Sequence, residues 1–507
     1  MEHYITSQSV ENYGAAGYLK GLRARFLSGG YSRERFVYLA ARTYMLIDKP
    51  KRAVALLESL DAPITSSDYN GKLLELTLKL RTLEAPAYPT CSLNMIAKNE
   101  AGNIACALES IDDIMDEIVV CDTGSVDSTR EIASLFGAVV VSAPWKNDFS
   151  AARNRAISAS GCSSIFWMDA DDVLDGNSKA HLVNLWRSAG PIAAAMRVAC
   201  RQDNCGMGEF MQVRLFPRSH GLRFERRVHE QIMFSLRREG ICLVQCPWVR
   251  IVHTGYASAH ARKTKALRNE PLIVAELRDH PEDPALQLNY GDCLMTLERW
   301  DDALATYLNI ARNQTLYAVH PEVFVQSLFN IACILFSKKA YGPAIKWLNA
   351  CLNLDPSRTE ALLFLGRSHE AMGDMAAALD NFVAAARGSG KLRQTATNEV
   401  KIKIQSIYQC ARLLLLNEKY GLAEELLTHA TLAFPTVVEY HTLLGRAAFK
   451  QNKLKEAAMA FMRSLSLSPH HNTDAYIGMA LVYARMHDAA KAQAFLNSAI
   501  LYKKNLA

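Results

Sequence analysis

Four aspartates crowd into the stretch "WMDADDVLD", directly after the apolar run "SSIF": they are Asp169, Asp171, Asp172 and Asp175. Carboxylates this close repel one another unless a cation or solvent separates them. Since only 21% of the residues are charged, the crowding is a local feature that needs a local cause. The stretch is either a solvated turn or a metal site, because hard divalent cations prefer such oxygen ligands.

Two other polar stretches follow apolar, strand-like runs. "AKNEAG" comes after "CSLNMI", and "CDTGSVDST" comes after "DEIVV". Because ligands of open α/β sheets bind beyond the carboxyl ends of the strands, both stretches should share one edge with the aspartates. Asp122 can accept hydrogen bonds from a base or ribose there, and Gly124 and Ser125 allow the backbone to turn close to a ligand. Residues 127–129 are expected to cap the next helix.

The elements that must position these residues are short strands that alternate with helices. Between about Pro89 and Val252, runs such as "AVVVSAP" and "SSIFWMD" alternate with helical stretches such as "NIACALESI" and "STREIASLF". This alternation predicts a parallel α/β sheet. The first predicted strand is not followed by G-x-G-x-x-G, which excludes a dinucleotide-binding dehydrogenase.

The second half of the chain carries an internal repeat. Two small residues stand twelve positions apart, and a large apolar residue follows four positions after the second. The six sets are Gly291, Ala303 and Tyr307; Ala332, Ala344 and Leu348; Gly366, Ala378 and Phe382; Ala411, Ala423 and Leu427; Gly445, Ala457 and Phe461; and Ala480, Ala492 and Leu496. Small residues let two antiparallel helices approach closely, and the large residue fills their groove. The pattern resembles the tetratricopeptide repeat, which implies an all-α solenoid.

The length of 507 residues exceeds what one hydrophobic core usually organises. We expect an N-terminal helical, repeat-like segment over 1–88, an α/β domain over 89–260 and a tetratricopeptide-repeat domain over 261–507. The repeat phase recurs once near the N-terminus, at Ala41, Tyr44, Ala53 and Leu57.

Several motifs of the middle region stand in one collinear order: "LNMIAKNEAGNIACALESI", "DEIVVCDTGSVDSTREIA", "FSAARNRAI", "IFWMDADD", "VRLF", "RRVHEQI" and "IVHTGY". Together they resemble family 2 glycosyltransferases of GT-A fold. The last three resemble the subgroup that includes lipopolysaccharide-core glucosyltransferases and sublancin-type peptide S-glycosyltransferases. The resemblance covers residues 89 to about 260. It implies an α/β GT-A domain, Rossmann-like in binding a nucleotide sugar, with UDP as the expected nucleotide and Mg²⁺ or Mn²⁺ as the expected ion.

The resemblance also implies roles for individual residues. Asp169 would lie near the donor ribose, Asp171 would ligate the ion that bridges the two phosphates, and His253 would complete the metal shell. The other implied donor-binding residues are Asn99, Glu100, Asp122 and Arg153.

Simpler explanations stay open beside these roles. Arg153 can be an exposed arginine on a helix surface, where this residue type is common. His253 can be a core histidine with its hydrogen bonds satisfied. Asp172 and Asp175 can each belong to a solvated turn or a helix cap.

An inverting transfer needs a base that takes the acceptor's proton as the acceptor attacks the anomeric carbon. His229 and Glu230 in "RRVHEQ" are adjacent and should point to different sides of their backbone. We expect Glu230 to be the base and His229 to be a positioning group. A thiol acceptor would need less help, because a thiol pKa of about 8.5 makes thiolate accessible near neutral pH.

Two further groups of residues have open interpretations. Arginines are dense over residues 214–238. They can form a solvated basic face, or they can bind an anionic donor, a phosphorylated acceptor or a lipid headgroup. Four of the twelve cysteines, Cys200, Cys205, Cys242 and Cys246, can hold a structural zinc or be buried thiols.

Three functions remain possible for such a chain. It can glycosylate a peptide or protein that the repeats bind, glycosylate a cell-envelope glycolipid, or be an inactive scaffold. The intact D-x-D pattern disfavours the scaffold, and helical repeats bind extended peptides more often than lipids. The net charge of +6 does not call for nucleic acid. The chain shows no signal-peptide pattern and no run of about 18 apolar residues, so we expect a cytoplasmic protein.

Overall fold

The computed structural model describes residues 2–60, 67–81, 88–188, 190–201, 207–255, 259–388, 398–470 and 472–504. The chain divides into two compact units. The first contains residues 1–303, and the second begins at Leu304. This division falls beyond the expected domain boundary at residue 260, which lies at the start of helix α10 (Ala259–Asp279).

The first unit is built around a mixed sheet in the strand order β3-β2-β1-β4-β7-β6-β8-β5. Its parallel part consists of β1 (Cys91–Ala97), β2 (Glu117–Asp122), β3 (Val139–Ser142) and β4 (Ser164–Trp167). These are the four strands that the alternating pattern predicts, so the predicted parallel α/β arrangement is confirmed here. The register pairs Ala97 with Asp122 and Asn94 with Trp167, which brings the three predicted polar stretches to one edge.

A second group of four strands, which the local pattern did not indicate and which mixes parallel and antiparallel pairings, completes this sheet. It consists of β7 (Met207–Pro217), β6 (Ile192–Arg201), β8 (Cys242–His253) and β5 (Asp172–Leu174). β7 pairs antiparallel with β4, and β8 pairs antiparallel with β5. The register of the last pair sets Asp172 directly opposite His253. Residues 81 positions apart in the chain therefore meet at the edge that carries the aspartates.

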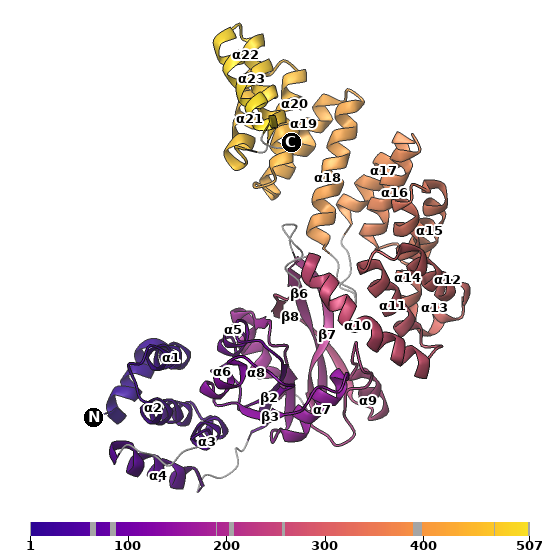
Figure 1. Ribbon diagram of the computed structural model, residues 1–507. Helices are drawn as coiled ribbons and strands as arrows, with labels where there is room; N and C mark the ends of the chain where they lie inside the picture. The colour runs from indigo at the N-terminus through magenta and orange to yellow at the C-terminus, as the bar shows by residue number, and fades with distance from the viewer. Residues whose placement is uncertain are drawn as a thin grey trace. The chain divides into compact units, whose positions relative to one another are not determined.

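Helices cover both faces of the sheet (Figure 1). One face packs against α5 (Ile104–Glu109), α6 (Thr129–Leu135) and α8 (Lys179–Ser188) through a core that includes Leu108, Phe136 and Trp186. The other face packs against α7 (Phe149–Ala159) and α9 (Met233–Arg238). Three layers of this kind bury both faces of a sheet, which fits the apolar character of its central strands.

Four N-terminal helices pack beside this domain within the same unit. They are α1 (Glu2–Leu27), α2 (Arg33–Leu46), α3 (Pro50–Glu58) and α4 (Ser67–Arg81). Ala41, Tyr44 and Ala53 are fully buried in their core, and Leu57 is half-buried. The residues expected to form one helical pair thus lie on α2 and α3.

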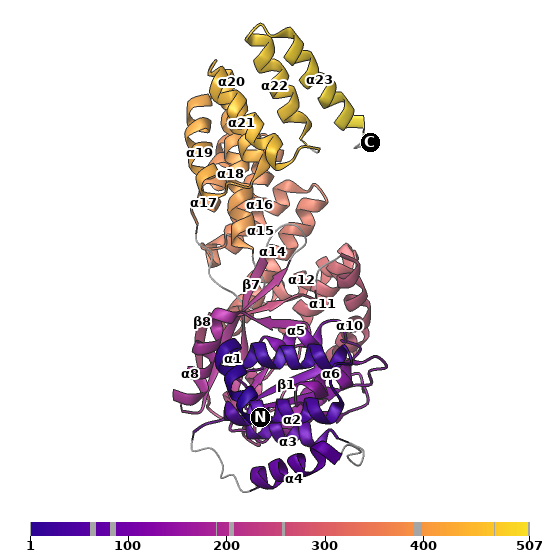
Figure 2. The same ribbon diagram turned by 90° about the vertical axis from the view of Figure 1, so that its left-hand side faces the viewer.

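The second unit consists of antiparallel helix pairs that follow one another along the chain, as Figures 1 and 2 show. They are α14 (Pro321–Ser337) with α15 (Tyr341–Leu354), α16 (Thr359–Ala371) with α17 (Met375–Arg387), α18 (Glu399–Leu416) with α19 (Tyr420–Ala433), α20 (Val438–Lys450) with α21 (Leu454–Leu467), and α22 (Thr473–Arg485) with α23 (Ala489–Lys504). The first predicted pair lies on α11 (Pro284–Thr296) and α12 (Trp300–Arg312), and the short α13 (Leu316–Val319) follows it.

The packing inside these pairs matches the repeat pattern. A Cβ atom on Gly366 would lie 2.6 Å from the ring of Phe382, and one on Gly445 would lie 2.7 Å from the ring of Phe461. The small residues are therefore needed for close approach of the two helices, and the predicted all-α repeat region is confirmed. The last set departs from the others, because Leu496 is 41% exposed. Among the described residues, no helix is long and apolar enough to cross a membrane.

Candidate functional site

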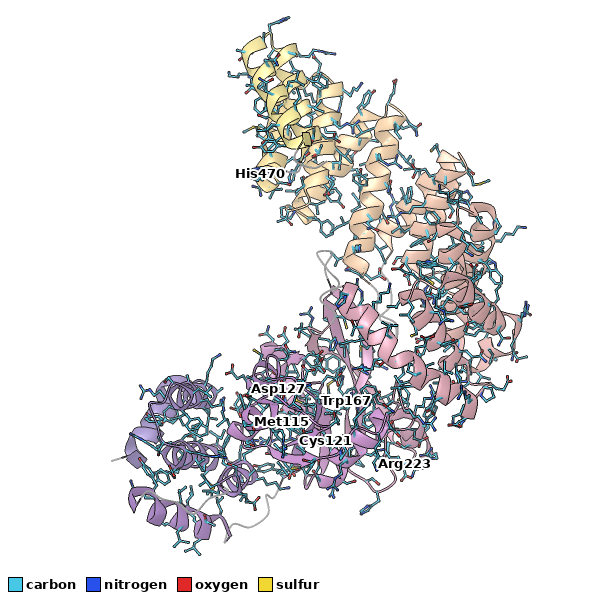
Figure 3. The ribbon with its side chains drawn as sticks, viewed as in Figure 1. Met115, Cys121, Asp127, Trp167, Arg223 and His470 are labelled. Carbon is cyan, nitrogen blue, oxygen red and sulfur yellow. The ribbon has the colours of Figure 1, made fainter. Side chains whose placement is uncertain are left out.

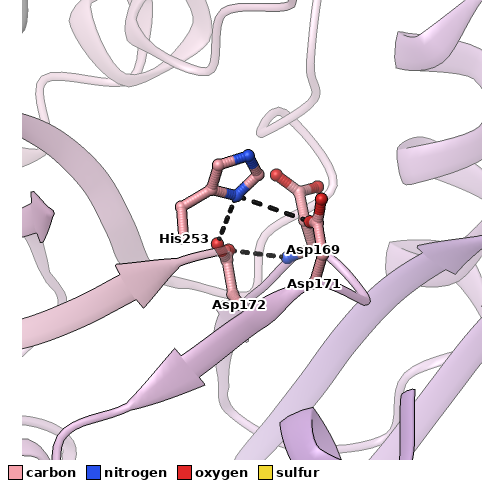
Figure 4. A group of neighbouring side chains, drawn as sticks. All are labelled: Asp169, Asp171, Asp172 and His253. Atoms are coloured by element: carbon pink, nitrogen blue, oxygen red, sulfur yellow. Dashed lines mark hydrogen bonds and ion pairs between the residues drawn. The ribbon is translucent and has the colours of Figure 1, made fainter. Parts of the chain in front are cut away.

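A cluster of three carboxylates and one imidazole lies at the edge predicted for the ligand (Figure 4). One side-chain ligand atom from each of Asp169, Asp171, Asp172 and His253 lies within 4.8 Å of the others. Asp169 and Asp171 come from the turn after β4, Asp172 begins β5, and His253 ends β8. Three of the four crowded aspartates therefore belong to one compact cluster, and Asp175 does not.

Asp172 is the buried centre of this cluster, with no exposed surface. Its carboxylate accepts hydrogen bonds from Arg214 Nη1 at 2.7 Å and from the backbone N–H of Asp169 at 2.9 Å, and it lies 2.8 Å from His253 Nδ1. A solvated turn or a helix cap is thus the wrong interpretation for Asp172. It is correct for Asp175, whose carboxylate accepts from Asn177 N at the start of the short 3₁₀ helix Gly176–Ser178.

Burial and the surrounding charges shift the pKa values of Asp169, Asp171 and His253 in different ways. Burial alone would raise the pKa of Asp169, but the guanidinium groups of Arg153 and Arg214 bring that pKa well below its usual range. Burial raises the pKa of Asp171, and its like-charged neighbours add to the effect. Burial would lower the pKa of His253, but the hydrogen bond with Asp172 and the nearby carboxylates raise it overall.

Arg153 connects the cluster to the loop that carries the proposed base. Its Nη2 donates to Asp169 Oδ1 at 2.8 Å, and its Nε donates to Glu230 Oε1 at 2.6 Å. The guanidinium is 6% exposed and lies 4.0 Å from the ring centroid of Trp167, which Figure 3 labels. The exposed-surface explanation for Arg153 is therefore wrong.

The backbone around His229 and Glu230 turns sharply. Arg226 and His229 both have positive φ, at 80° and 52°, and Glu225 and Gln231 form an isolated β-bridge. As predicted for adjacent residues, the two side chains diverge: Glu230 faces Arg153, whereas His229 is exposed. Desolvation lowers the pKa of His229 below its usual value.

Five of the seven arginines over residues 214–238 pair with acidic side chains of the same unit. Arg226 pairs with Asp283, and Arg227 pairs with Asp279 at 2.6 Å. Other pairs join Arg223 and Arg238 to Glu225, and Arg214 to Asp172. Val228 is buried among residues of α10 and α11. These arginines therefore anchor the base-carrying loop, which weakens the interpretation of this segment as an open anion-binding face.

The loops after β1 and β2 are tied to each other. Asn99 Oδ1 accepts from the N–H of Val126 at 2.9 Å, and Asn99 N donates to Ser125 Oγ at 2.9 Å. Asp122 is buried and accepts from the N–H groups of Gly124 and Ser125, both at 3.2 Å. Asn99 and Asp122 therefore shape these loops by internal contacts, whatever else they bind.

Other polar groups of the same loops also have partners inside the protein. Glu100 Oε2 accepts from Asn103 Nδ2 at 2.8 Å, and Glu100 N donates to Thr129 Oγ1 at 2.8 Å. Asp127 caps as expected by accepting from Thr129 N, and it also accepts from Ala101 N at 3.1 Å.

The cysteines do not form the zinc set that their spacing allows. In the parallel register of β6 and β8, Cys242 pairs with Ile192 and Cys246 with Met196, whereas Cys200 lies at the other end of β6 opposite His253. Cys200 and Cys242 thus lie at opposite ends of the ladder and cannot share an ion. Cys205 lies outside the described residues.

Three residues of this region escaped sequence reasoning. Asp172 was visible in the motif, but nothing local indicated its partners. Arg214 was noted only as part of a basic stretch, although its guanidinium is 2% exposed and lies 3.9 Å from the Trp167 ring centroid. Lys265 on α10 has its Nζ 3.7 Å from Asp171 Oδ2. The motif "VRLF" contains Arg214 and the motif "IVHTGY" precedes Lys265, so these motifs could have pointed to both residues.

The donor set of the cluster fits a hard divalent cation. Carboxylate oxygens with one imidazole nitrogen suit Mg²⁺ or Mn²⁺ better than a soft metal. A histidine that ligates a metal usually donates its other ring N–H to a carboxylate, and the contact between His253 and Asp172 has this form. The side chains of the cluster are therefore of the types that such an ion prefers.

Comparison with known sequences identifies both regions. The sequence profile described as "Glycosyl transferase family 2" matches residues 92–247. Residues 92–247 are a family 2 glycosyltransferase domain. Profiles of the tetratricopeptide repeat match residues 255–318, 325–358 and 408–471. The chain thus joins a mixed α/β glycosyltransferase domain to tetratricopeptide repeats, as the motifs predicted.

Two curated proteins are similar over larger parts of the chain. A TPR repeat-containing protein of Synechococcus elongatus is 32% identical over 216 residues, which cover 40% of this chain and 52% of that protein. The SPbeta prophage-derived glycosyltransferase SunS of Bacillus subtilis is 27% identical over 289 residues, which cover 54% of this chain and 67% of SunS. The matched region thus spans about half to two thirds of these relatives.

Solved structures with likeness to this chain include MamA 41-end from Desulfovibrio magneticus RS-1. It is 17% identical with a TM-score of 0.31, and the match covers 36% of this chain and 96% of MamA. Likeness at this level supports no argument about function.

Proposed function

We propose that this protein transfers a sugar, with inversion at the anomeric carbon, from a nucleotide sugar to a peptide or protein acceptor. UDP is the expected nucleotide. The observation that carries the proposal is the cluster of Asp169, Asp171, Asp172 and His253 at the carboxyl edge of a family 2 glycosyltransferase sheet. Glu230 lies next to that cluster, because Arg153 donates hydrogen bonds to both Glu230 and Asp169. Its carboxylate is the proposed base for the acceptor.

The proposed roles follow from charge and burial. Asp171 and His253 hold a divalent ion, and Asp169 contacts the donor ribose. The ion, when bound, neutralises negative charge that develops on the departing nucleoside diphosphate. Asp172 is too deeply buried to contact the donor. Its carboxylate instead orients His253 and forms an ion pair with Arg214. Asn99, Glu100 and Asp122 build the loops that line the nucleotide cleft.

Glu230 acts as the base that accepts the acceptor's proton. Its Oε1 is held by Arg153, which fixes the carboxylate beside Asp169 while Glu230 itself remains 14% exposed. His229 is exposed one residue earlier and positions the acceptor. Arg153 donates from Nε to Glu230 and from Nη2 to Asp169, and in this way holds the two carboxylates in place near the proposed diphosphate site.

The acceptor class rests on the repeats and on similarity. The similarity to the glycosyltransferase SunS supports a transferase of its kind, and tetratricopeptide repeats favour a peptide or protein ligand. Transfer to a glycolipid draws less support, because most of the arginines that could form a lipid-headgroup face are paired with acidic side chains.

A binding screen followed by acceptor assays tests this proposal. Thermal unfolding is measured with UDP- and GDP-sugars in Mn²⁺, and the donor that stabilises the protein is then offered with peptides or with lipopolysaccharide-core lipids. We expect stabilisation by one donor class and transfer to peptide. Transfer to lipid alone would replace the acceptor assignment, and no stabilisation by any nucleotide sugar would contradict the donor assignment.

A further inference from the structure

Lys265 is a cationic side chain beside the cluster to which neither motif nor proposed mechanism gives a role. It lies on α10, and its Nζ is 3.7 Å from Asp171 Oδ2. The side chain is 31% exposed, whereas that of Asp171 is 13% exposed. The ammonium therefore reaches the cluster from its solvent side.

Thr254 and Gly255, which follow β8, lie against Asp171. The N–H and the hydroxyl of Thr254 donate to the backbone oxygen of Asp171 at 3.0 and 2.9 Å. A Cβ atom on the next residue, Gly255, would lie 1.8 Å from Asp171 Oδ2 and 2.9 Å from Lys265 Nζ. Only a glycine leaves room here for the carboxylate and the ammonium to approach the same stretch of backbone.

Each aspartate of the cluster has a cationic partner, and the partners differ in burial. Arg153 pairs with Asp169 and Arg214 pairs with Asp172, and these guanidinium groups are 6% and 2% exposed. Both arginines lie over the Trp167 ring, which fixes them further. Lys265 pairs with Asp171 from a more exposed position on a flexible four-carbon stem. It is the partner best able to move.

We propose that Lys265 is a diphosphate-binding residue. While no nucleotide is bound, Lys265 pairs with the Asp171 carboxylate. When a divalent ion binds that carboxylate, the ammonium turns to the diphosphate of the donor. The ammonium then balances the charge of the anionic leaving group beside the ion. This inference rests on the proposed function, since it names a further residue for the same donor.

The two roles of Lys265 can be separated, because removing its charge should strengthen the binding of Mn²⁺ alone and weaken the binding of UDP with Mn²⁺. Lys265→Met removes a positive charge near Asp171, so Mn²⁺ alone should bind more tightly, by about twofold or more, as measured by electron paramagnetic resonance. The same change removes a charged contact to phosphate, so UDP with Mn²⁺ should bind about tenfold or more weakly in calorimetric titration. Uridine, which lacks the phosphates, should bind as it does to the unaltered protein.

Two variants serve as controls. Lys263→Met removes a lysine two residues away that pairs with Glu298 at 3.8 Å and is 51% exposed, and it should change neither affinity. Lys265→Arg keeps the charge and should retain most of the UDP affinity. If the unaltered protein binds GDP in place of UDP, GDP and guanosine are the probes.

The outcomes distinguish this inference from the proposed function. If the unaltered protein binds UDP or GDP and Lys265→Met binds it equally well, Lys265 has no role at the diphosphate and the proposed function stands. A Lys265→Met variant that loses Mn²⁺ and nucleotide together also overturns the inference, because that pattern reports damage to the cluster. If the unaltered protein binds neither nucleotide, the proposed function and the inference both fail.

Discussion

A buried carboxylate is stable only when its charge has partners, and Asp172 shows how this requirement shapes the site at the scale of single residues. With no exposed surface, it depends on Arg214 and on contact with His253. Removing one partner of a buried ion pair leaves the other charge uncompensated, which is far more damaging than removing both. Side chains that touch no donor can therefore control the geometry of those that do.

Arg214→Met should destabilise the first unit strongly, because it leaves the Asp172 charge buried without its guanidinium. We expect the free energy of unfolding to fall by about 3–5 kcal/mol, as measured by urea denaturation. Arg218→Met is the control, since Arg218 is exposed and should change stability by less than about 0.5 kcal/mol. Equal stability of the Arg214→Met protein would mean that Asp172 does not depend on this pair.

Glu230→Gln should separate donor binding from transfer. The amide keeps the size of the side chain and can still accept from Arg153, but it cannot take the acceptor's proton. Donor affinity should hold while turnover on an alcohol acceptor falls by roughly 10²-fold or more, measured by single-turnover kinetics. Unchanged turnover on an alcohol would remove Glu230 from the base role.

A control variant and a contrasting variant accompany Glu230→Gln. Glu225→Gln changes a carboxylate of the same loop that pairs with Arg223 and Arg238, and it should leave turnover within about twofold of the unaltered protein. His253→Ala should act in the opposite order to Glu230→Gln and weaken Mn²⁺ and donor binding first.

At the scale of elements, a buried ionic network fastens the N-terminal helices to the α/β domain. Asp112 lies after α5 with no exposed surface and accepts from Arg23 of α1, Tyr44 of α2 and Arg52 of α3. Close by, Lys49 Nζ lies 2.6 Å from Asp116 Oδ1. The helices therefore depend on specific charges as well as on apolar packing.

Asp112→Asn should weaken this docking by about 3–5 kcal/mol in urea denaturation, since two arginines lose their buried counter-charge. Asp113→Asn is a matched control at the next residue, because Asp113 is 30% exposed and pairs with a 25% exposed Lys179. It should cost less than about 1 kcal/mol. If both variants lost a similar free energy of unfolding, the buried network would contribute no more to stability than the exposed pair.

The same network predicts a dependence of stability on pH. Burial alone would raise the pKa of Asp112, but Arg23 and Arg52 lower it overall. The folded pKa thus lies below the unfolded value of about 3.9, so the contribution is present above about pH 4 and is lost as the pH falls through the folded value. Urea titrations between pH 2.5 and 7 should show a shallower acid loss for Asp112→Asn, and identical slopes would contradict the assignment.

Local patterns were sufficient for some elements of this fold and not for others. The four parallel strands and the repeat helices carry their period in consecutive residues, so β1, β2, β3, β4 and the pairs from α11 onward were predictable. The strands β6, β7 and β8 join the sheet through pairings, parallel and antiparallel, that no short stretch specifies. Asp172 meets Arg214 and His253 through these pairings, across 42 and 81 residues. The structural role of Asp172 was therefore not predictable from the sequence, whereas the proposed roles of Asp171 and His253 follow from the resemblance to family 2 glycosyltransferases.

At the scale of the whole molecule, the repeats and the transferase domain should be separable in function. Each repeat buries apolar surface against its neighbours, and residues of α16 and α17 share a core with Ile402, Cys410 and Leu413 of α18. A shortened chain therefore needs a new polar cap on α17 to stay folded. Among the residues that the structure describes, the core clusters of the sheet contain no side chain beyond residue 398.

A chain that ends at residue 388 and carries such a cap should keep donor hydrolysis while transfer to a peptide acceptor falls. Nucleotide release and peptide glycosylation are measured in parallel on the shortened and full-length proteins. Equal loss of the two activities would mean that the later repeats support the fold and do not bind the acceptor.

The central claim is that the aspartate cluster binds a divalent ion and a nucleotide sugar, and nucleotide release from UDP- and GDP-sugars tests it most directly. The unaltered protein and Asp175→Asn, which alters only the cap and a long contact with Arg250, should both release nucleotide in Mn²⁺. Asp171→Asn should release none while unfolding at a similar temperature, and EDTA should abolish release until Mn²⁺ is restored. Full activity of Asp171→Asn, or undiminished activity in EDTA, would contradict the account.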